Sequence, residues 1–135
     1  MRSKGIDLQV NMDVTSLKKT NGGIKVSHKG GHFEVDQVIY ATGRVPKTAA
    51  LGLENVGVEL DYNGAIKVDQ HSATSLSSIY AVGDVTDRVA LTPVAIREAM
   101  AFVETVFKNN PTCPDHELIA TAVFTQPEIG TVGMG

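Results

Sequence analysis

Cysteine and aromatic residues are scarce in this sequence. Of its 135 residues one is a cysteine, none is a tryptophan and 5% are aromatic. A single thiol cannot form an internal disulfide, so Cys113 is expected to be a free, unreactive thiol in a reducing compartment. The four histidines lack the clustering that metal sites require, and we interpret them as surface or turn residues. No metal site is predicted. The histidines are His28, His32, His71 and His116.

Long apolar runs and basic runs are also missing. No stretch approaches the roughly 20 apolar residues that span a bilayer. The first residues are not followed by the apolar segment of a signal peptide. The net charge is −3 and no cluster of lysines and arginines stands out, which argues against nucleic acid as a partner. We therefore expect a cytoplasmic protein that binds neither membranes nor nucleic acid.

The first third of the chain has the pattern of a β-meander. Apolar and polar residues alternate over Ile6–Val10, Ile24–Val26 and Phe33–Val35, as in half-buried strands. Glycine-rich turns at 21–23 and 29–31 separate the later segments. The polar partners in each alternation predict that one face of this sheet is exposed.

Two uninterrupted apolar runs follow, at Val38–Ala41 and Ile79–Val82. Such runs are typical of strands covered on both faces, as in a parallel sheet. Each run is followed within two residues by glycine and a polar residue. A short alternating strand is expected between them, at Ile66–Val68, and another strand at Ile119–Thr125.

One long helix is predicted over 93–109, with Thr92 as N-cap and Pro93 in the first position. Its apolar residues recur at three-to-four spacing and form one stripe, while charged residues occupy the remaining positions. Two buried strands and one helix cannot cover both faces of a parallel sheet, so we expect other residues to complete the core. The stripe contains Ile96, Ala99, Met100, Val103, Val106 and Phe107, and the charged positions are Arg97, Glu98, Glu104 and Lys108.

The residues alone indicate a candidate ligand site near Gly83, Asp84 and Thr92. Open α/β sheets bind ligands beyond the carboxyl ends of their strands, where glycine permits close approach. A carboxylate can accept hydrogen bonds from ligand hydroxyls, and a helix start favours an electron-rich group. Structural interpretations remain open: Asp84 could bond its own backbone, Thr92-Pro93 could be an ordinary helix start, and Arg44 could be a solvated charge.

Longer motifs are more specific. The segments VIYATGRVP (38–46), GAIKVD (64–69) and IYAVGDV (79–85) resemble, in order and spacing, the class I pyridine nucleotide-disulfide oxidoreductases, which have two dinucleotide-binding domains. LTPVA (91–95) and FTQPEIGTVG (124–133) resemble the glutathione and trypanothione reductase branch. Dihydrolipoamide dehydrogenases usually have a Leu-Ala-His type stretch at the former position. The resemblance covers nearly the whole chain.

The resemblance implies an α/β fold in which this chain is a fragment. Residues 1–43 would be the last strands of an NAD(P)-binding domain, 44–115 the second part of an FAD-binding domain, and 116–135 the start of an α+β dimerisation domain. The parent protein would be a homodimer that passes electrons from NADPH through FAD to glutathione disulfide.

Site residues are implied by the same resemblance. Asp84 would bond the ribityl chain of FAD, and Thr92 with the helix after it would lie beside the pyrimidine end of the flavin. Gly83 and Leu91 are further cofactor-binding residues implied by the resemblance. Other residues would lie near the NADPH path. None would form a covalent bond with substrate. The residues near that path are Gly43, Ala90, Ala122 and Phe124.

Several parts of the family's machinery do not occur in these 135 residues. They are the G-x-G-x-x-G fingerprint, the redox-active cysteine pair and the His-Pro and glutamate region that supplies the acid/base. We therefore expect this chain to be inactive alone. Three alternatives stay open: a non-catalytic FAD- or nucleotide-binding module, an inert partial product, and a relative of dihydrolipoamide dehydrogenase.

Overall fold

The computed structural model describes residues 1–133, and its contacts divide the chain into two compact units. The first unit is Met1–Gly43 and the second is Arg44–Gly135. The last two residues of the expected 116–135 domain lie outside the described part. Among the described helices, none has the length and apolar character needed to cross a membrane.

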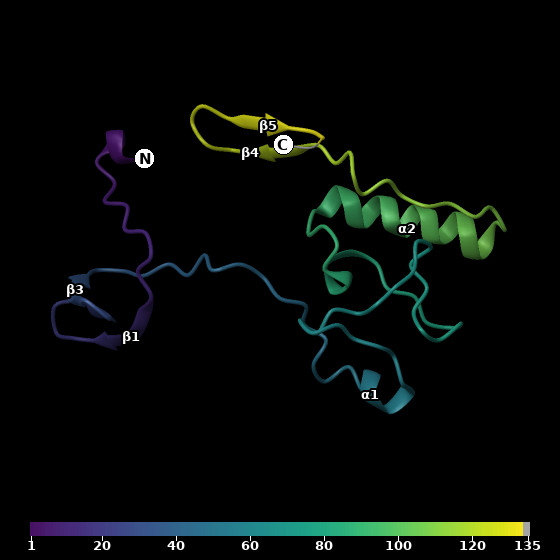
Figure 1. Ribbon diagram of the computed structural model, residues 1–135, viewed down its shortest axis with the longest axis horizontal. Helices are drawn as coiled ribbons and strands as arrows, with labels where there is room; N and C mark the ends of the chain where they lie inside the picture. The colour runs from purple at the N-terminus through teal and green to yellow at the C-terminus, as the bar shows by residue number, and fades with distance from the viewer. Residues whose placement is uncertain (134–135) are drawn as a thin grey trace. The chain divides into compact units, whose positions relative to one another are not determined.

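The first unit is a three-stranded antiparallel sheet in the order β1-β2-β3 (Figure 1). It follows a short 3-10 helix, η1, at Arg2–Lys4. The strands are β1 (Val14–Lys19), β2 (Ile24–His28) and β3 (Gly31–Val35). Val26 of the central strand is 4% exposed and pairs with Leu17 on one side and Phe33 on the other. The β-meander is thus confirmed for its second and third strands.

The position of the first strand was predicted wrongly. Residues 6–10 form no strand, and Ile6 and Val10 are 51% and 66% exposed. The strand lies instead at Val14–Lys19, where the turn at 20–23 joins it directly to β2. Thr20 N–H closes that turn on Gly23 O at 2.9 Å. Turn geometry fixes which residues pair, so it outweighs a local alternation of apolar residues.

The apolar run at 38–41 is extended but unpaired, which also differs from the prediction. Ile39 and Tyr40 are 88% and 70% exposed. A buried strand of a parallel sheet needs a paired neighbour and cover on both faces. Within the described residues, 38–41 has neither.

The second unit begins with loops around a small core. Its helix α1 is Leu53–Val56, and isolated bridges join Leu60 to Ile66 and Ala73 to Tyr80. The strands expected at 66–68 and 79–82 are therefore reduced to single bridges. Val58, Ile66 and Ala81 are buried against one another.

Two aspartates of this unit shape its loops in the same way. Asp61 Oδ1 accepts the N–H groups of Asn63 and Ala65 at 2.8 and 2.9 Å. Asp69 Oδ1 accepts those of His71 and Ala73 at the same distances. Such aspartate turns replace strand pairing as the source of local backbone order.

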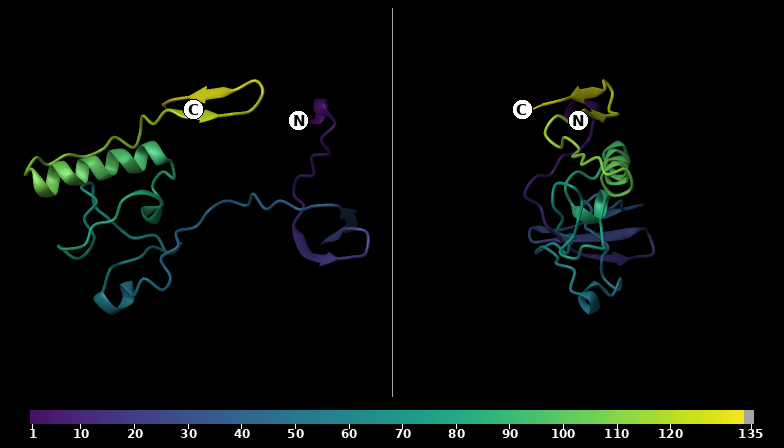
Figure 2. Two further views of the ribbon diagram at one scale, coloured as in Figure 1. Left: turned by 180° about the vertical axis from the view of Figure 1, so that it is seen from behind. Right: turned by 90° about the vertical axis from the view of Figure 1, so that its right-hand side faces the viewer.

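The long helix α2 spans Thr92–Phe107, which confirms the predicted helix with shifted ends. Its N-cap is Leu91 rather than Thr92, and no side chain caps it. Thr92 is the first helical residue, and Pro93 lies in the first turn, where its missing N–H costs nothing. Residues 110–118 then run back along the helix (Figures 1 and 2), tied by the Thr112 N–H to Thr105 Oγ1 at 3.0 Å.

The apolar stripe of α2 faces outward in this structure. Ile96, Met100 and Phe107 are 55%, 65% and 73% exposed. The residues of α2 that are buried are Val94, Glu98 and Ala101. The face with most apolar residues is therefore not the face that packs on the rest of the unit.

Replacing Met100 by glutamine tests this orientation. Because Met100 is largely exposed, the free energy of unfolding of the chain is expected to change by no more than about 0.5 kcal/mol. Truncation of a buried methionine would instead cost about 2–5 kcal/mol. Urea unfolding followed by circular dichroism at 222 nm measures the difference. A loss above about 2 kcal/mol would mean that the stripe is core.

The chain ends in a two-stranded antiparallel hairpin of β4 (Thr121–Val123) and β5 (Ile129–Thr131). The strand predicted at 119–125 is thus confirmed over its middle. A β-meander, one long helix and this hairpin together make the α/β fragment that the sequence predicts.

Candidate functional site

The Gly83-Asp84 turn packs closely on α2. Residues Gly83–Thr86 form a 3-10 helix, η2, drawn as the short coil beside the N-terminal half of α2 in Figure 1. Gly83 is buried and has φ of +73°. A Cβ at this position would lie 3.1 Å from the Cβ of Ala95 on α2. Both the left-handed backbone and the close approach to α2 therefore require glycine.

Asp84 presents its carboxylate to solvent next to this buried glycine. Its side chain is 45% exposed and its Oδ2 lies 3.0 Å from Nε of Arg44, whose side chain is 78% exposed. Such an exposed ion pair is worth about 0–1 kcal/mol. A ligand hydroxyl can therefore compete for the carboxylate at little cost. Arg44, interpreted from sequence as a solvated charge, is exposed but has a defined partner.

The start of α2 continues from the same loop. Leu91 O accepts the N–H groups of Val94 and Ala95 at 3.0 and 3.1 Å, which closes the first turn. Ala90 and Thr92 are exposed and Leu91 is half-buried. The first N–H groups of a helix have no partner inside it, and the positive end of the helix dipole lies there.

A buried glutamate joins the turn to the helix, and sequence reasoning missed it. Glu98 is 1% exposed. Its Oε2 accepts the Gly83 N–H at 2.5 Å, and its Oε1 lies 2.9 Å from Arg88 and 2.7 Å from His116. The sequence pattern puts Glu98 among the charged positions of the helix and predicts it to be exposed. The available signal was its spacing, because residues 94, 98 and 101 share one helix face.

His116 also departs from its interpretation as a surface histidine. Its side chain is only 25% exposed and contacts the buried Glu98. Its neighbour Asp115 accepts the backbone N–H groups of Glu117 and Leu118, at 2.7 and 3.2 Å. These bonds hold the pKa of the Asp115 carboxyl below its usual value, because they favour the charged form. The segment after α2 is therefore held in place by the backbone bonds of Asp115 and by the contact of His116 with Glu98.

Cys113 is exposed and lies beside a histidine. Its Sγ is 3.3 Å from Nδ1 of His71, a residue 42 positions earlier in the chain. The sequence gives no indication of this contact, since the two residues come from different loops. The expectation that this thiol is unreactive stays a prediction.

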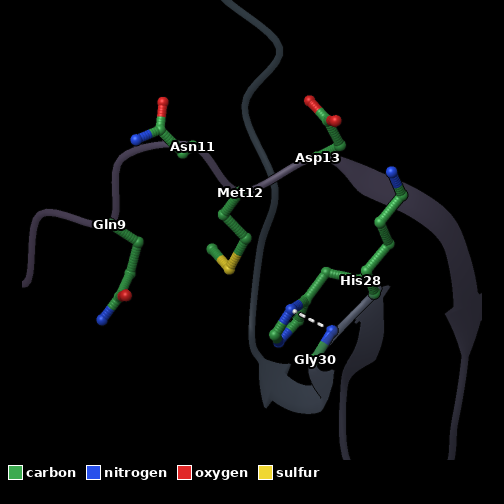
Figure 3. A pocket seen from close by; sticks show the side chains of 7 residues that line it. Gln9, Asn11, Met12, Asp13, His28 and Gly30 are labelled. Carbon is green, nitrogen blue, oxygen red and sulfur yellow. Dashed lines mark hydrogen bonds between the residues drawn. The ribbon is translucent and has the colours of Figure 1, made fainter.

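A polar hollow of about 340 Å³ lies in the first unit near His28 (Figure 3). The His28 Nδ1 accepts the Gly30 N–H at 3.2 Å, drawn as the dashed line in Figure 3. This bond closes the turn between β2 and β3. His28 thereby has a structural role in the turn, as the Lys29-Gly30-Gly31 signal predicts.

The remaining predicted site residues are dispersed. Gly43 ends the first unit, exposed and with φ of +101°. Ala122 lies in β4 and is exposed, and Phe124 is 89% exposed just after that strand. Within the second unit, the contacts of Glu98 bring the Gly83-Asp84 turn to α2, which begins at Thr92 with Leu91 as its N-cap. Their roles toward a cofactor stay predictions.

Comparison with known proteins establishes the family. Residues 1–99 match the sequence profile of the pyridine nucleotide-disulphide oxidoreductases. The chain belongs to this family. It is 50% identical over 135 residues to the glutathione reductase of Burkholderia cepacia, covering 99% of this chain and 30% of that protein. It is 43% identical over 134 residues to the trypanothione reductase of Trypanosoma congolense, covering 98% of this chain and 27% of that protein.

The fold of this family member agrees with a solved flavoprotein. The HOCl-induced flavoprotein disulfide reductase RclA of Escherichia coli superimposes with a TM-score of 0.90 at 28% identity, over 98% of this chain and 31% of that chain. The chain thus spans about a third of the relatives that it matches. The resemblance drawn from the sequence motifs is confirmed.

Proposed function

We propose that this chain supplies the ribityl and pyrimidine-end contacts for FAD in an NADPH-dependent glutathione-disulfide oxidoreductase. The observation that carries the proposal is the Gly83-Asp84 turn, which leaves a carboxylate exposed while its backbone is fixed against α2. The likeness to the glutathione reductase of Burkholderia cepacia supports the choice of reaction and of glutathione disulfide as substrate.

The residues present fit such a cofactor. Asp84 offers carboxylate oxygens, the natural acceptors for the hydroxyls of a ribityl chain. The close packing of Gly83 on Ala95 fixes the turn against α2, so the backbone that carries Asp84 has a defined position. The partial positive charge at the start of α2, near Leu91 and Thr92, stabilises electron density on a group docked there. Bound FAD would supply the hydride and electron transfer itself.

The wider assignments belong to the same proposal. Gly43, Ala90, Ala122 and Phe124 would lie near the NADPH path, and the parent protein would be a cytoplasmic homodimer. The outward apolar stripe of α2 supports the need for further chain, because monomeric proteins rarely expose large contiguous apolar patches. By this proposal the chain alone is inactive.

An Asp84→Asn substitution in a chimera tests the flavin contact. Residues 1–135 replace the matching segment of the Burkholderia cepacia reductase, and FAD affinity is measured by quenching of flavin fluorescence. Loss of a charged hydrogen-bond acceptor is expected to weaken FAD binding about tenfold or more. Asp87→Asn, on the same turn, is the matched control and should bind FAD normally.

Two outcomes would contradict the proposal. One is a folded chimera with its native aspartate that binds no FAD. The other is equal affinity in the Asp84 and Asp87 variants. Titration of the unmodified 135-residue chain with FAD addresses the alternative of an independent binding module, for which saturable binding at low micromolar concentration would be required.

A further inference from the structure

We propose that Glu98 is the positioning residue of the flavin site, holding Asp84 at a fixed distance from the start of α2. The inference rests on the proposed function, because it takes Asp84 and Thr92 as cofactor contacts. Glu98 itself is 1% exposed and cannot touch a ligand. Its effect must therefore pass through the groups that it binds.

The two carboxylate oxygens of Glu98 bind different parts of the unit. Oε2 accepts the N–H of Gly83, the residue directly before Asp84. Oε1 faces Arg88, in the loop between the turn and α2, and His116, in the segment after α2. One side chain on the helix thus links the turn, the loop and the returning chain.

Arg88 closes these contacts into a ring around Gly83. Its Nε donates to Thr86 Oγ1 at 3.3 Å, and Thr86 Oγ1 donates to Gly83 O at 2.8 Å. Both polar backbone groups of Gly83 are therefore held, the N–H by Glu98 and the C=O by Thr86. A second Arg88 nitrogen donates to Ser72 Oγ at 3.2 Å, which ties the ring to the core loops. Because Asp84 follows Gly83 directly, this ring fixes the origin of its side chain.

The rigidity of α2 fixes the distance between the Gly83-Asp84 turn and the start of the helix. Glu98 lies one turn after Val94, whose N–H bonds Leu91 O in the first turn. The backbone between Leu91 and Glu98 is a rigid helix segment, so the turn held by Glu98 has a fixed offset from the helix start. A neutral apolar residue at 98 would remove that offset, since nothing else on α2 binds the Gly83 N–H in this structure of residues 1–133.

A conservative Glu98→Gln substitution is the first test, made in the full 135-residue chain. The Gly83 amide proton should lie far downfield in the chain with Glu98, since charge-assisted bonds are short and strong. It should move upfield in Glu98→Gln. Glu104→Gln, on the same helix but with a side chain that binds Lys108 and Asn110, should leave it unchanged. An unmoved Gly83 signal in Glu98→Gln would overturn the proposal.

The second test measures the flavin in the chimera with the Burkholderia cepacia reductase. Glu98→Gln is expected to weaken FAD binding about tenfold and to change the visible circular dichroism of bound flavin. Val26→Ala, a core truncation in the unit Met1–Gly43, should lower stability while leaving that spectrum unchanged. A change of the same kind in both variants would show that Glu98 acts through stability alone.

The outcomes separate this inference from the proposed function. If FAD affinity and the flavin spectrum are unchanged in a folded Glu98→Gln chimera, Glu98 has no positioning role and the proposed function stands. If the chimera that retains Glu98 binds no FAD, the proposed function fails, and the flavin role of Glu98 fails with it.

Discussion

Replacing Glu98 by alanine is expected to destabilise the chain by about 3–5 kcal/mol. Glu98 is 1% exposed and its carboxylate pairs with Arg88 and His116. The side chains of Arg88 and His116 are only 22% and 25% exposed, so removing the carboxylate leaves both poorly solvated and without this acceptor, which is the source of a penalty of this size. The Gly83 N–H would also lose its acceptor in a buried position.

This loss is a large share of the total stability of a small domain, which is commonly about 5–15 kcal/mol. Urea unfolding monitored by circular dichroism measures it. Glu104→Ala is the control, because Glu104 forms its ion pair with Lys108 on the exposed side of the same helix and should cost far less. A loss below about 1 kcal/mol for Glu98→Ala would show that the network is not closed in solution.

The double variant Glu98→Met with Arg88→Met distinguishes the energy of the ion pair from the cost of burying its two charges. Replacing both members of a buried ion pair by apolar residues is often neutral. We therefore expect this variant to be more stable than Glu98→Ala alone. The difference from the summed single effects gives the coupling between the two residues.

Gly83→Ala is the second substitution expected to have a large effect, at about 2–3 kcal/mol. One part of the loss comes from φ of +73°, a left-handed conformation that costs a residue with a Cβ roughly 1–2 kcal/mol. The other part comes from the contact of the new Cβ with Ala95 Cβ at 3.1 Å. That contact would push the turn, with Asp84, away from α2.

Gly57→Ala is a matched control for the backbone cost. Gly57 has φ of +80°, and a Cβ there meets nothing within 4 Å. The two substitutions therefore share the left-handed penalty and differ in the contact with the helix. Equal losses in the urea midpoint would rule out close packing of the turn on α2. A larger loss for Gly83→Ala measures that packing.

Much of the local structure was predictable from the sequence. The turns at 21–23 and 29–31 identified β2 and β3, because glycine-rich turns between alternating segments define a hairpin. Pro93 and the three-to-four spacing identified α2 to within two residues. The turns that follow Asp61 and Asp69 carry short-range bonds and need only neighbouring residues to form.

Features that depend on distant pairing were not predictable in the same way. The apolar run at 38–41 has the composition of a buried strand, but a strand exists only where another strand bonds to it. The first strand shifted from 6–10 to 14–19 for the same reason. The apolar stripe of α2 predicts that the stripe faces the core. In the structure the opposite face, which carries Glu98, meets the turn at Gly83.

The sequence by itself determined the family, the long helix, the β2–β3 hairpin and the Gly83-Asp84 pair, because each is encoded by residues close together along the chain. Only the tertiary structure decided that Glu98 is buried and joined to Arg88, His116 and Gly83. These groups are separated by 10 to 18 positions from the glutamate, and no local pattern encodes which charges meet. A buried charge is stable only among partners that the fold brings to it, so its role appears once the chain is folded.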